Sequence, residues 1–294
     1  MNRHELEAFL EVADLGSFSR AAERLHLTQP AVSKRIQALE QQLKTRLFDR
    51  VGQIDVARLL QPRAQALLRD MDDTRRVLRD LDLRVAGVLS LATSHHVGLH
   101  RLAPVLREFI REYPDVQLDI RFEDSEAAHE LVRAAAAEIA VVTLNPKGDA
   151  DLDCRVLWDD PLSFVVAADH ELARRDAPLS LAELAASHPV LPGPATYTGR
   201  IVLEAFAAAG IRLTPTLATN YLETIAMLVS TGLGWSVLPR NMSGTALSVP
   251  LVALDTEAPP LRRSLGSVCN PRRTLSNAAQ AFLGVLLRHA DGAA

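Results

Sequence analysis

Residues 29–43 combine a narrow apolar stripe with a polar opposite face, directly after a short turn. At 100° per residue the stripe lies on one side of an α-helix and consists of Val32, Ile36, Leu39 and Leu43. Thr28 can cap this helix, and Pro30 fits in its first turn, where a missing N–H costs nothing. The opposite face carries hydroxyl, amide and ammonium groups suited to phosphates and base edges, on Pro30, Ser33, Lys34, Gln37 and Gln41.

Two shorter helical patterns precede this one. The first ends at Gly16, and Ser17 can cap the second, in which Ala21 and Ala22 allow a neighbouring helix to approach closely. A short helix, a tight turn and a capped helix with a polar face form a helix-turn-helix, whose second helix enters the major groove of DNA. An ordinary amphipathic surface helix is the alternative. The turn chemistry and the polar face together favour DNA binding.

The charge distribution is compatible with a local anion-facing surface and equally with an ordinary solvated helix face. The chain has 294 residues and a formal net charge of -4, so it does not coat nucleic acid by bulk electrostatics. Between residues 33 and 50, however, basic residues outnumber acidic ones; they are Lys34, Arg35, Lys44, Arg46 and Arg50. No apolar segment is long enough to cross a bilayer and the chain starts without a signal-peptide pattern, so we expect a cytoplasmic protein.

The stretch "SFSRAAERLHLTQPAVSKRIQALEQQLKTRLFDR" resembles the winged helix-turn-helix of the LysR-type transcriptional regulators. The shared features are the paired alanines, Gln-Pro-Ala-Val-Ser, a later Leu-Glu and Leu-Phe-Asp-Arg. The resemblance implies that Gln29, Pro30, Ser33 and Lys34 approach the major groove, and that Arg50 begins the wing. Gln37 joins this DNA-binding set from the same polar face. The family's Leu-Thr-x-Ala-Gly turn after the wing is missing, so the wing is expected to be shortened.

A long helix is predicted to follow the DNA-binding domain, which we place at residues 1–57. Its apolar seam follows steps of three and four and consists of Leu60, Ala64, Leu67, Met71, Thr74, Leu78, Leu81 and Val85. Pro62 is expected in its first turn or at a kink. We predict a dimerising linker over residues 58–86; a helix packed on its own domain is the alternative. The resemblance implies a homodimer, and further a homotetramer, on palindromic double-stranded DNA.

From Gly87 onward, strand and helix patterns alternate, which predicts an α/β fold with a mostly parallel sheet. One expected helix presents a core face of Leu102, Val105, Leu106, Phe109, Ile110 and Tyr113. The resemblance implies a two-lobed effector-binding domain over residues 87–294, similar to periplasmic binding proteins. Its first lobe is predicted at 87–157 plus 263–294, and its second at 158–262.

Hydroxyl residues gather where predicted strands end and helices begin, and such junctions attract anionic or polar ligands. Hydroxyls at helix starts are more often simple caps. The resemblance favours a binding site for a small anionic or polar effector between the lobes. The predicted effector-binding residues are Thr93, Ser94, His95, Ser125, Thr143, Thr196, Tyr197 and Thr198.

No metal site, cofactor or catalytic constellation is predicted. His96 and His100 have a metal-ligand spacing, but no cysteine or carboxylate cluster accompanies them within the same turn. Cys154 and Cys269 give neither a disulfide framework nor a zinc spacing, and enzyme motifs are missing. We therefore predict an effector-controlled, sequence-specific DNA-binding regulator. A transport protein explains the cleft but not the helix-turn-helix, and a cytoplasmic small-molecule-binding protein with weakened DNA binding is the alternative.

Overall fold

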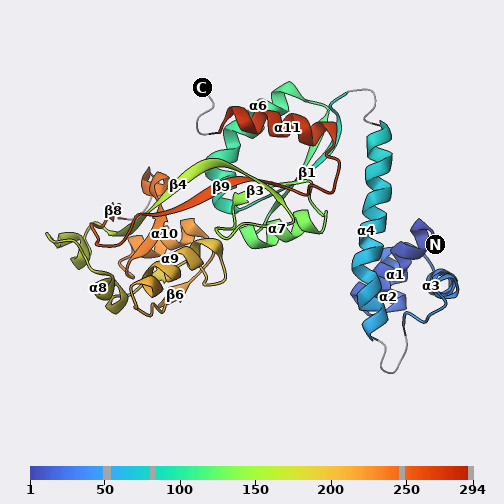
Figure 1. The fold of residues 1–294 in the computed structure, drawn as a ribbon, viewed down its shortest axis with the longest axis horizontal. Coiled ribbons are helices and arrows are strands. Elements are labelled where there is room, and N and C mark those ends of the chain that lie inside the picture. Colours follow the sequence, from blue (N-terminus) through green and yellow to red (C-terminus); the bar gives the residue numbers. More distant parts are fainter. Residues whose placement is uncertain (49–53, 80–83, 245–248, 291–294) are drawn as a thin grey trace. The chain divides into compact units, whose positions relative to one another are not determined.

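The computed structural model describes residues 1–48, 54–79, 84–244 and 249–290 (Figure 1). The chain divides between Asp82 and Leu83 into two compact units. The first unit contains the helices α1 (Arg3–Leu15), α2 (Phe18–Arg24), α3 (Gln29–Leu43) and α4 (Ile54–Arg79). Arg50 and the rest of the predicted wing at 49–53 lie outside the described residues.

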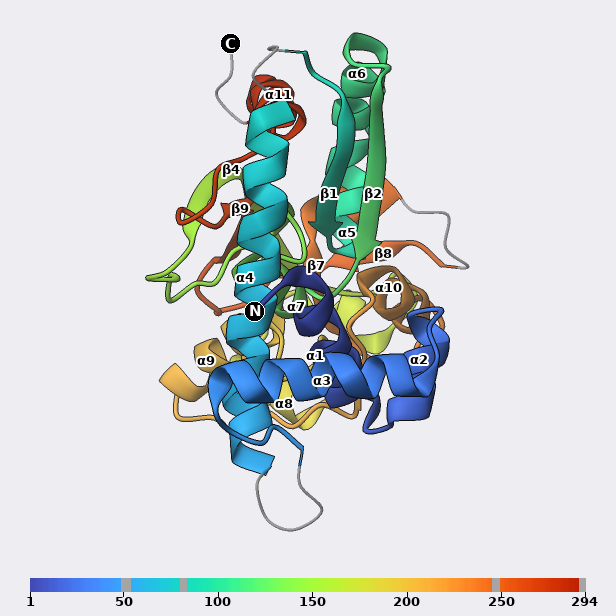
Figure 2. The ribbon, with the colours of Figure 1, turned by 90° about the vertical axis from the view of Figure 1, so that its right-hand side faces the viewer.

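The first three helices begin and end as their local sequence dictates. A capping box between Asn2 and Glu5 starts α1, which ends at Gly16 in the left-handed conformation (φ 61°). The Ser17 hydroxyl accepts from the Arg20 N–H and starts α2. The three helices pack together (Figure 2) around a core that includes Leu6, Phe9, Val12, Ala21, Ala22, Val32, Ile36 and Leu39.

Two predicted details of α3 are wrong. The Thr28 side chain makes no capping hydrogen bond; instead its backbone carbonyl accepts from Ala31 and Val32. Leu43 is 37% exposed rather than buried, because it is the last residue of α3 and the turn at Lys44 (φ 51°) follows at once. Val32, Ile36 and Leu39 are buried as predicted.

The residues of the predicted seam on α4 fall into a packed group and an exposed group. Its first turns pack on the core of their own unit through Val56, Ala57, Leu60, Ala64 and Leu68, as the alternative interpretation required. Farther along the same stripe, Leu67 and Met71 are each 39% exposed. The helix already begins at Ile54, so Pro62 lies inside it and not in its first turn. The side chain of Leu78, and Leu81 entirely, lie outside the described residues.

The second unit is built around one mixed sheet. Its strands are β1 (Gly87–Thr93), β2 (Val116–Phe122), β3 (Ile139–Thr143), β4 (Asp153–Ala167), β7 (Ser236–Pro239), β8 (Leu251–Ala253) and β9 (Leu261–Cys269). A small second sheet pairs β5 (Val190–Leu191) with β6 (Leu217–Ala218). The helices are α5 (His95–Val97), α6 (Ala103–Glu112), α7 (Ser125–Arg133), α8 (Leu181–Ala186), α9 (Tyr197–Ala208), α10 (Leu222–Ser230) and α11 (Asn277–Arg288), with a π-helical turn at Gly98–Leu102 and 3-10 turns at Glu171–Arg174 and Arg240–Gly244.

The prediction of a mostly parallel sheet is wrong. The strand order is β2-β1-β3-β9-β4-β7, and β8 also pairs with β4. Only β1 with β2, which run side by side in Figure 2, and β1 with β3 are parallel in this sheet. The pairs of β9 with β3 and β4, and of β4 with β7 and β8, are antiparallel. The reason is that β4 carries the chain out of one lobe and β9 brings it back in the opposite direction.

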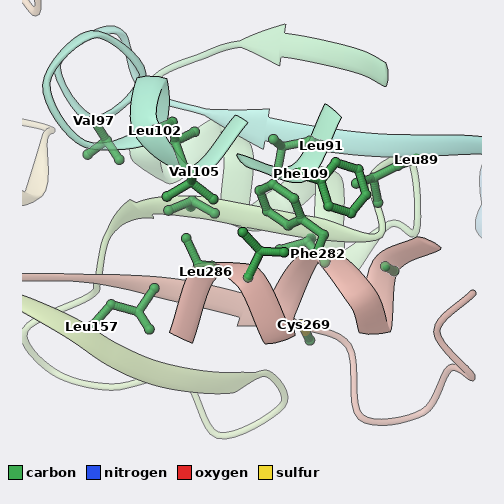
Figure 3. Close-up of a cluster of buried hydrophobic side chains, with 14 of the residues drawn as sticks. Leu89, Leu91, Val97, Leu102, Val105, Phe109, Leu157, Cys269, Phe282 and Leu286 are labelled. Atoms are coloured by element: carbon green, nitrogen blue, oxygen red, sulfur yellow. The ribbon is translucent and has the colours of Figure 1, made fainter. Parts of the chain in front are cut away.

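Two lobes share β4 and β9, which run from one to the other (Figure 1). In the first lobe α6 and α11 pack on the sheet, and Leu89, Leu91, Phe109 and Phe282 meet between them (Figure 3). Ile110, predicted in this core, is 53% exposed, because it lies on the outer side of α6.

The second lobe has its own core, formed around Phe164, Phe206 and Trp235. Trp158, which the predicted boundary assigned to this lobe, packs in the core of the first, where its indole N–H donates to the His289 carbonyl at 2.7 Å. Val85, predicted in the linker, also packs there. No described helix is both long and apolar enough to cross a membrane.

Candidate DNA-binding surface and effector pocket

Helix α3 presents its polar face outward while its other contacts hold it in place. Gln29, Pro30, Lys34 and Gln37 are exposed and Ser33 is half-buried. The Gln29 amide donates to the Ser33 hydroxyl at 3.0 Å, which orders the start of this face.

Two further contacts anchor α3. The Gln42 amide donates to both carboxylate oxygens of Glu5 on α1, at 3.1 and 3.2 Å. The Glu40 carboxylate accepts from the backbone N–H of Leu47 at 2.7 Å, closing the turn after the helix. These contacts and the apolar core hold the helix in its unit, and its exposed polar side is free to contact a groove.

The second unit contains a pocket between its two lobes, beside the strands β4 and β9. Its empty volume is about 510 Å³, including the part open to solvent. The lining includes every predicted effector-binding residue except Thr93. Those residues are Ser94, His95, Ser125, Thr143, Thr196, Tyr197 and Thr198.

Two predicted hydroxyls are already engaged. Thr93 is fully buried, and its hydroxyl donates to the Val141 carbonyl at 2.8 Å, so the structure places it behind the pocket wall. The Thr196 hydroxyl donates to the Gly193 carbonyl and accepts from the Gly199 N–H, and thus caps α9. Both hydroxyls have structural roles in the pocket's frame.

A buried arginine that was not among the predicted residues lines the pocket. Arg263, on β9, is 6% exposed, and its Nε donates to Oδ2 of the buried Asp160 at 2.7 Å. Its Nη1 donates to the Thr198 hydroxyl at 3.0 Å. Its Nη2 is buried and, among the described residues, has no hydrogen-bond partner. Burial lowers the pKa of Arg263, but guanidinium remains charged at any physiological pH.

Polar groups around Arg263 can complete an anion site. Ser94 lines the pocket with a hydroxyl that makes no side-chain capping bond. Thr198 accepts from Arg263, which leaves its own proton for a ligand, and Ser125 is in the same state because it accepts from the Thr143 N–H. One buried cation with an unused donor, together with free hydroxyl protons, suits a carboxylate or phosphate group.

The acidic residues of the pocket are paired across the two lobes. Asp124, in the first lobe, accepts from the Asn220 amide of the second lobe at 2.6 Å. The Glu126 carboxylate accepts from the Tyr197 N–H at the start of α9. These contacts hold the lobes together and occupy the carboxylates, so they leave Arg263 to attract an anion.

Aromatic groups and buried titratable groups complete the site. The His95 ring packs on Phe122 and Tyr221, with centroids 5.2 and 4.9 Å away.

Burial raises the pKa of the Tyr197 phenol to about 12, so this group stays neutral. Burial also lowers the pKa of His96. Burial alone would raise the pKa of Glu223. Hydrogen bonds outweigh burial, the largest contribution coming from His96, and lower the pKa to about 2.

Arg263 and Asn220 follow no motif that the sequence could reveal. Arg263 lies in a strand of mixed polarity next to Arg262, which is exposed. An arginine in a strand can be recognised as buried only when its acidic partner is known. The partner of Arg263 is Asp160, which lies 103 positions away in the sequence.

Sequence comparisons identify both units. The family described as "LysR substrate binding domain" matches residues 84–291, and "Bacterial regulatory helix-turn-helix protein, lysR family" matches residues 4–59. An uncharacterised HTH-type transcriptional regulator from the ibpB-leuC intergenic region of Azotobacter vinelandii is 59% identical over 108 residues, or 35% of this chain and 75% of that protein. These matches define a helix-turn-helix regulator with a substrate-binding domain, and the chain belongs to the LysR family.

Solved structures have the same fold. Full-length CbnR in complex with its target DNA matches with a TM-score of 0.68 and 18% identity, covering 100% of both chains. The regulatory domain of CcmR from Synechocystis, in complex with 2-PG, matches with a TM-score of 0.63 and 22% identity over 70% of this chain and 98% of that one.

Proposed function

We propose that this LysR-family regulator reads promoter DNA with the outer face of α3 and responds to a small anion bound around Arg263. The observation that supports it best is the exposed polar face on a helix whose opposite face is buried in the three-helix core. The structure of CbnR with DNA supports this use of the fold. Gln29, Pro30, Ser33, Lys34 and Gln37 are the proposed contacts in this surface, and Arg50 is proposed from the resemblance alone.

We propose further that the chain is a regulator in the cytoplasm, where bacterial promoter DNA is, and that it is not an enzyme. It acts as a homodimer through the exposed part of the α4 stripe, and the family resemblance adds the pairing of dimers into a tetramer. The alternative, a binding protein with weakened DNA contact, is not favoured, because the polar face of α3 is intact and unobstructed within its unit.

Lys34 tests the DNA-binding surface. Replacing the exposed lysine by alanine removes one phosphate contact, so we expect weaker binding to all duplexes and a salt slope, log K against log [salt], reduced by about 1. Fluorescence anisotropy with the chain's own upstream DNA at several salt concentrations measures both. Lys147→Ala is the control, because Lys147 lies in the second unit and pairs with Glu204. An unchanged slope in Lys34→Ala would remove Lys34 from the interface.

Ser94 tests the effector pocket. A screen of small carboxylates and phosphates by thermal shift should yield an anion that stabilises the second unit. Ser94→Ala removes one hydrogen bond to a charged ligand, so we expect the affinity for the anion to fall about 10- to 150-fold, as for a bond of about 1.5–3 kcal/mol. Isothermal titration measures this, and basal DNA binding should not change. Thr93→Val is the matched control, and equal losses in both variants would contradict the assignment of Ser94.

A further inference from the structure

The two lobes also meet at a second cluster of side chains, next to the effector pocket. His96 belongs to α5 and His100 to the π-helical turn that follows, both in the first lobe. Glu223 lies in the first turn of α10 in the second lobe. Each offers one ligand atom, and the three atoms lie within 4.8 Å of one another.

Two of the three distances within this cluster are close to the edges of a metal coordination shell. His100 Nε2 lies 3.1 Å from Oε1 of Glu223, and His96 Nδ1 lies 3.4 Å from the same oxygen. Ligands bound to zinc at 2.0–2.1 Å in a tetrahedron are about 3.4 Å apart. The centroids of the two imidazole rings lie 4.6 Å apart.

His96 supplies an independent reason to expect a ligand. Its side chain is 4% exposed, its Nδ1 lies 3.4 Å from Oε1 of Glu223, and its buried Nε2 has no hydrogen-bond partner among the described residues. A buried polar group without a partner costs free energy, so this imidazole is a candidate for binding a ligand. The π-helical turn at Gly98–Leu102 is also a rare element that tends to occur at functional sites.

We propose that His96, His100 and Glu223 bind one divalent transition-metal ion, with zinc the best fit, and that this ion joins the two lobes. Two imidazoles and one carboxylate suit zinc, cobalt or nickel and disfavour calcium and magnesium, which prefer oxygen ligands. The surrounding charges do not attract a cation by themselves, because Glu223 and Asp160 are balanced by Arg263 and Arg101, so binding depends on the two imidazole ligands.

The consequence is a second input to the regulator. His96 also lines the effector pocket, so an ion here lies beside the proposed anion site. Because its ligands come from both lobes, the ion stabilises the arrangement in which the lobes are together. This regulation rests on the proposed function, whereas binding of the ion itself does not.

A second cluster provides the control. His129, Asp149 and Cys154 also lie close enough to share an ion, but burial raises the pKa of the Cys154 thiol to about 11 and Asp149 already pairs with Arg133. A protonated thiol is a poor ligand. Cys154→Ser should therefore leave the binding of a metal ion unchanged.

The test is a titration of the chelator-treated full-length chain with Co²⁺, followed by visible absorption and by displacement with Zn²⁺. We expect one ion per chain, at least tenfold weaker affinity in His100→Ala and Glu223→Gln, and wild-type affinity in Cys154→Ser. Zinc at 100 times its dissociation constant should raise the melting temperature of the second unit by about 5–10 °C in the wild type, and Mg²⁺ should not.

Three results would overturn the site. They are no bound ion, equal affinity in His100→Ala and the wild type, or a thiolate-to-cobalt band that disappears in Cys154→Ser. His100→Gln provides a second variant with a polar side chain, and a cooperative melting transition of the second unit in each metal-free variant shows that it is folded. If the chain binds the ion but no DNA, the proposed function fails and the metal site stands.

Discussion

Arg263→Met should unfold the second unit at a temperature lower by roughly 6–20 °C, the shift that corresponds to a loss of about 3–5 kcal/mol. The substitution removes the main partner of Asp160, whose side chain is 2% exposed, and leaves a buried carboxylate with Arg101 at 3.9 Å as its nearest cation. An uncompensated buried charge is among the most costly changes in a protein. Differential scanning calorimetry of the full chain measures the transition.

A double variant separates the cost of the buried charge from the loss of packing. Asp160→Asn together with Arg263→Met removes both charges, so it should recover a large part of the lost stability. Arg262→Met is the matched control, because the neighbouring side chain is 68% exposed and should change the melting temperature little. If the double variant is no more stable than Arg263→Met, the ion pair is not the cause.

Leu67→Glu combined with Met71→Glu should separate the dimer and lower the affinity for a two-half-site promoter by about 10²–10⁴. The two apolar residues continue the stripe by which α4 packs on its own core, yet they lie exposed beyond it. Two carboxylates on each paired helix would face each other across the seam, and each monomer would then hold only one half-site. Analytical ultracentrifugation and DNA titration measure the two effects.

The matched control for the dimer is Gln65→Glu on the opposite side of α4. At 100° per residue, position 65 points away from positions 67 and 71, so a carboxylate there should preserve the dimer. A dimer that persists in the double variant would show that the subunits pair through another surface. Its DNA affinity would then stay close to that of the wild type.

The sequence revealed the elements that depend on local patterns. The Ser17 cap, the buried stripe of Val32, Ile36 and Leu39 on α3, and the strand–helix order from β1 to β3 follow from spacing and capping chemistry, and the structure confirms them. The direction of β9 could not be predicted, because it depends on the chain leaving and re-entering a lobe.

In the pocket, too, some residues could be predicted from local sequence and others could not. Hydroxyl residues at strand ends were visible as a pattern, but Thr93 proved to hydrogen-bond within the sheet, because its side chain points to Val141 and not to the cleft. Arg263 and Glu223 carried no local signal. The expectation against a metal considered only the turn that contains His96 and His100, whereas the carboxylate beside them comes from 123 positions farther along the chain.

The most direct test of the account is to select bound duplexes from a random pool with the wild-type chain and with Gln37→Ala. If the outer face of α3 reads bases, the wild type selects an inverted repeat, and the exposed Gln37 is responsible for the preference at one position in each half-site. The variant should lose that preference and keep the others. Selection of the same sequences by both chains, or of no sequence by the wild type, would contradict the account.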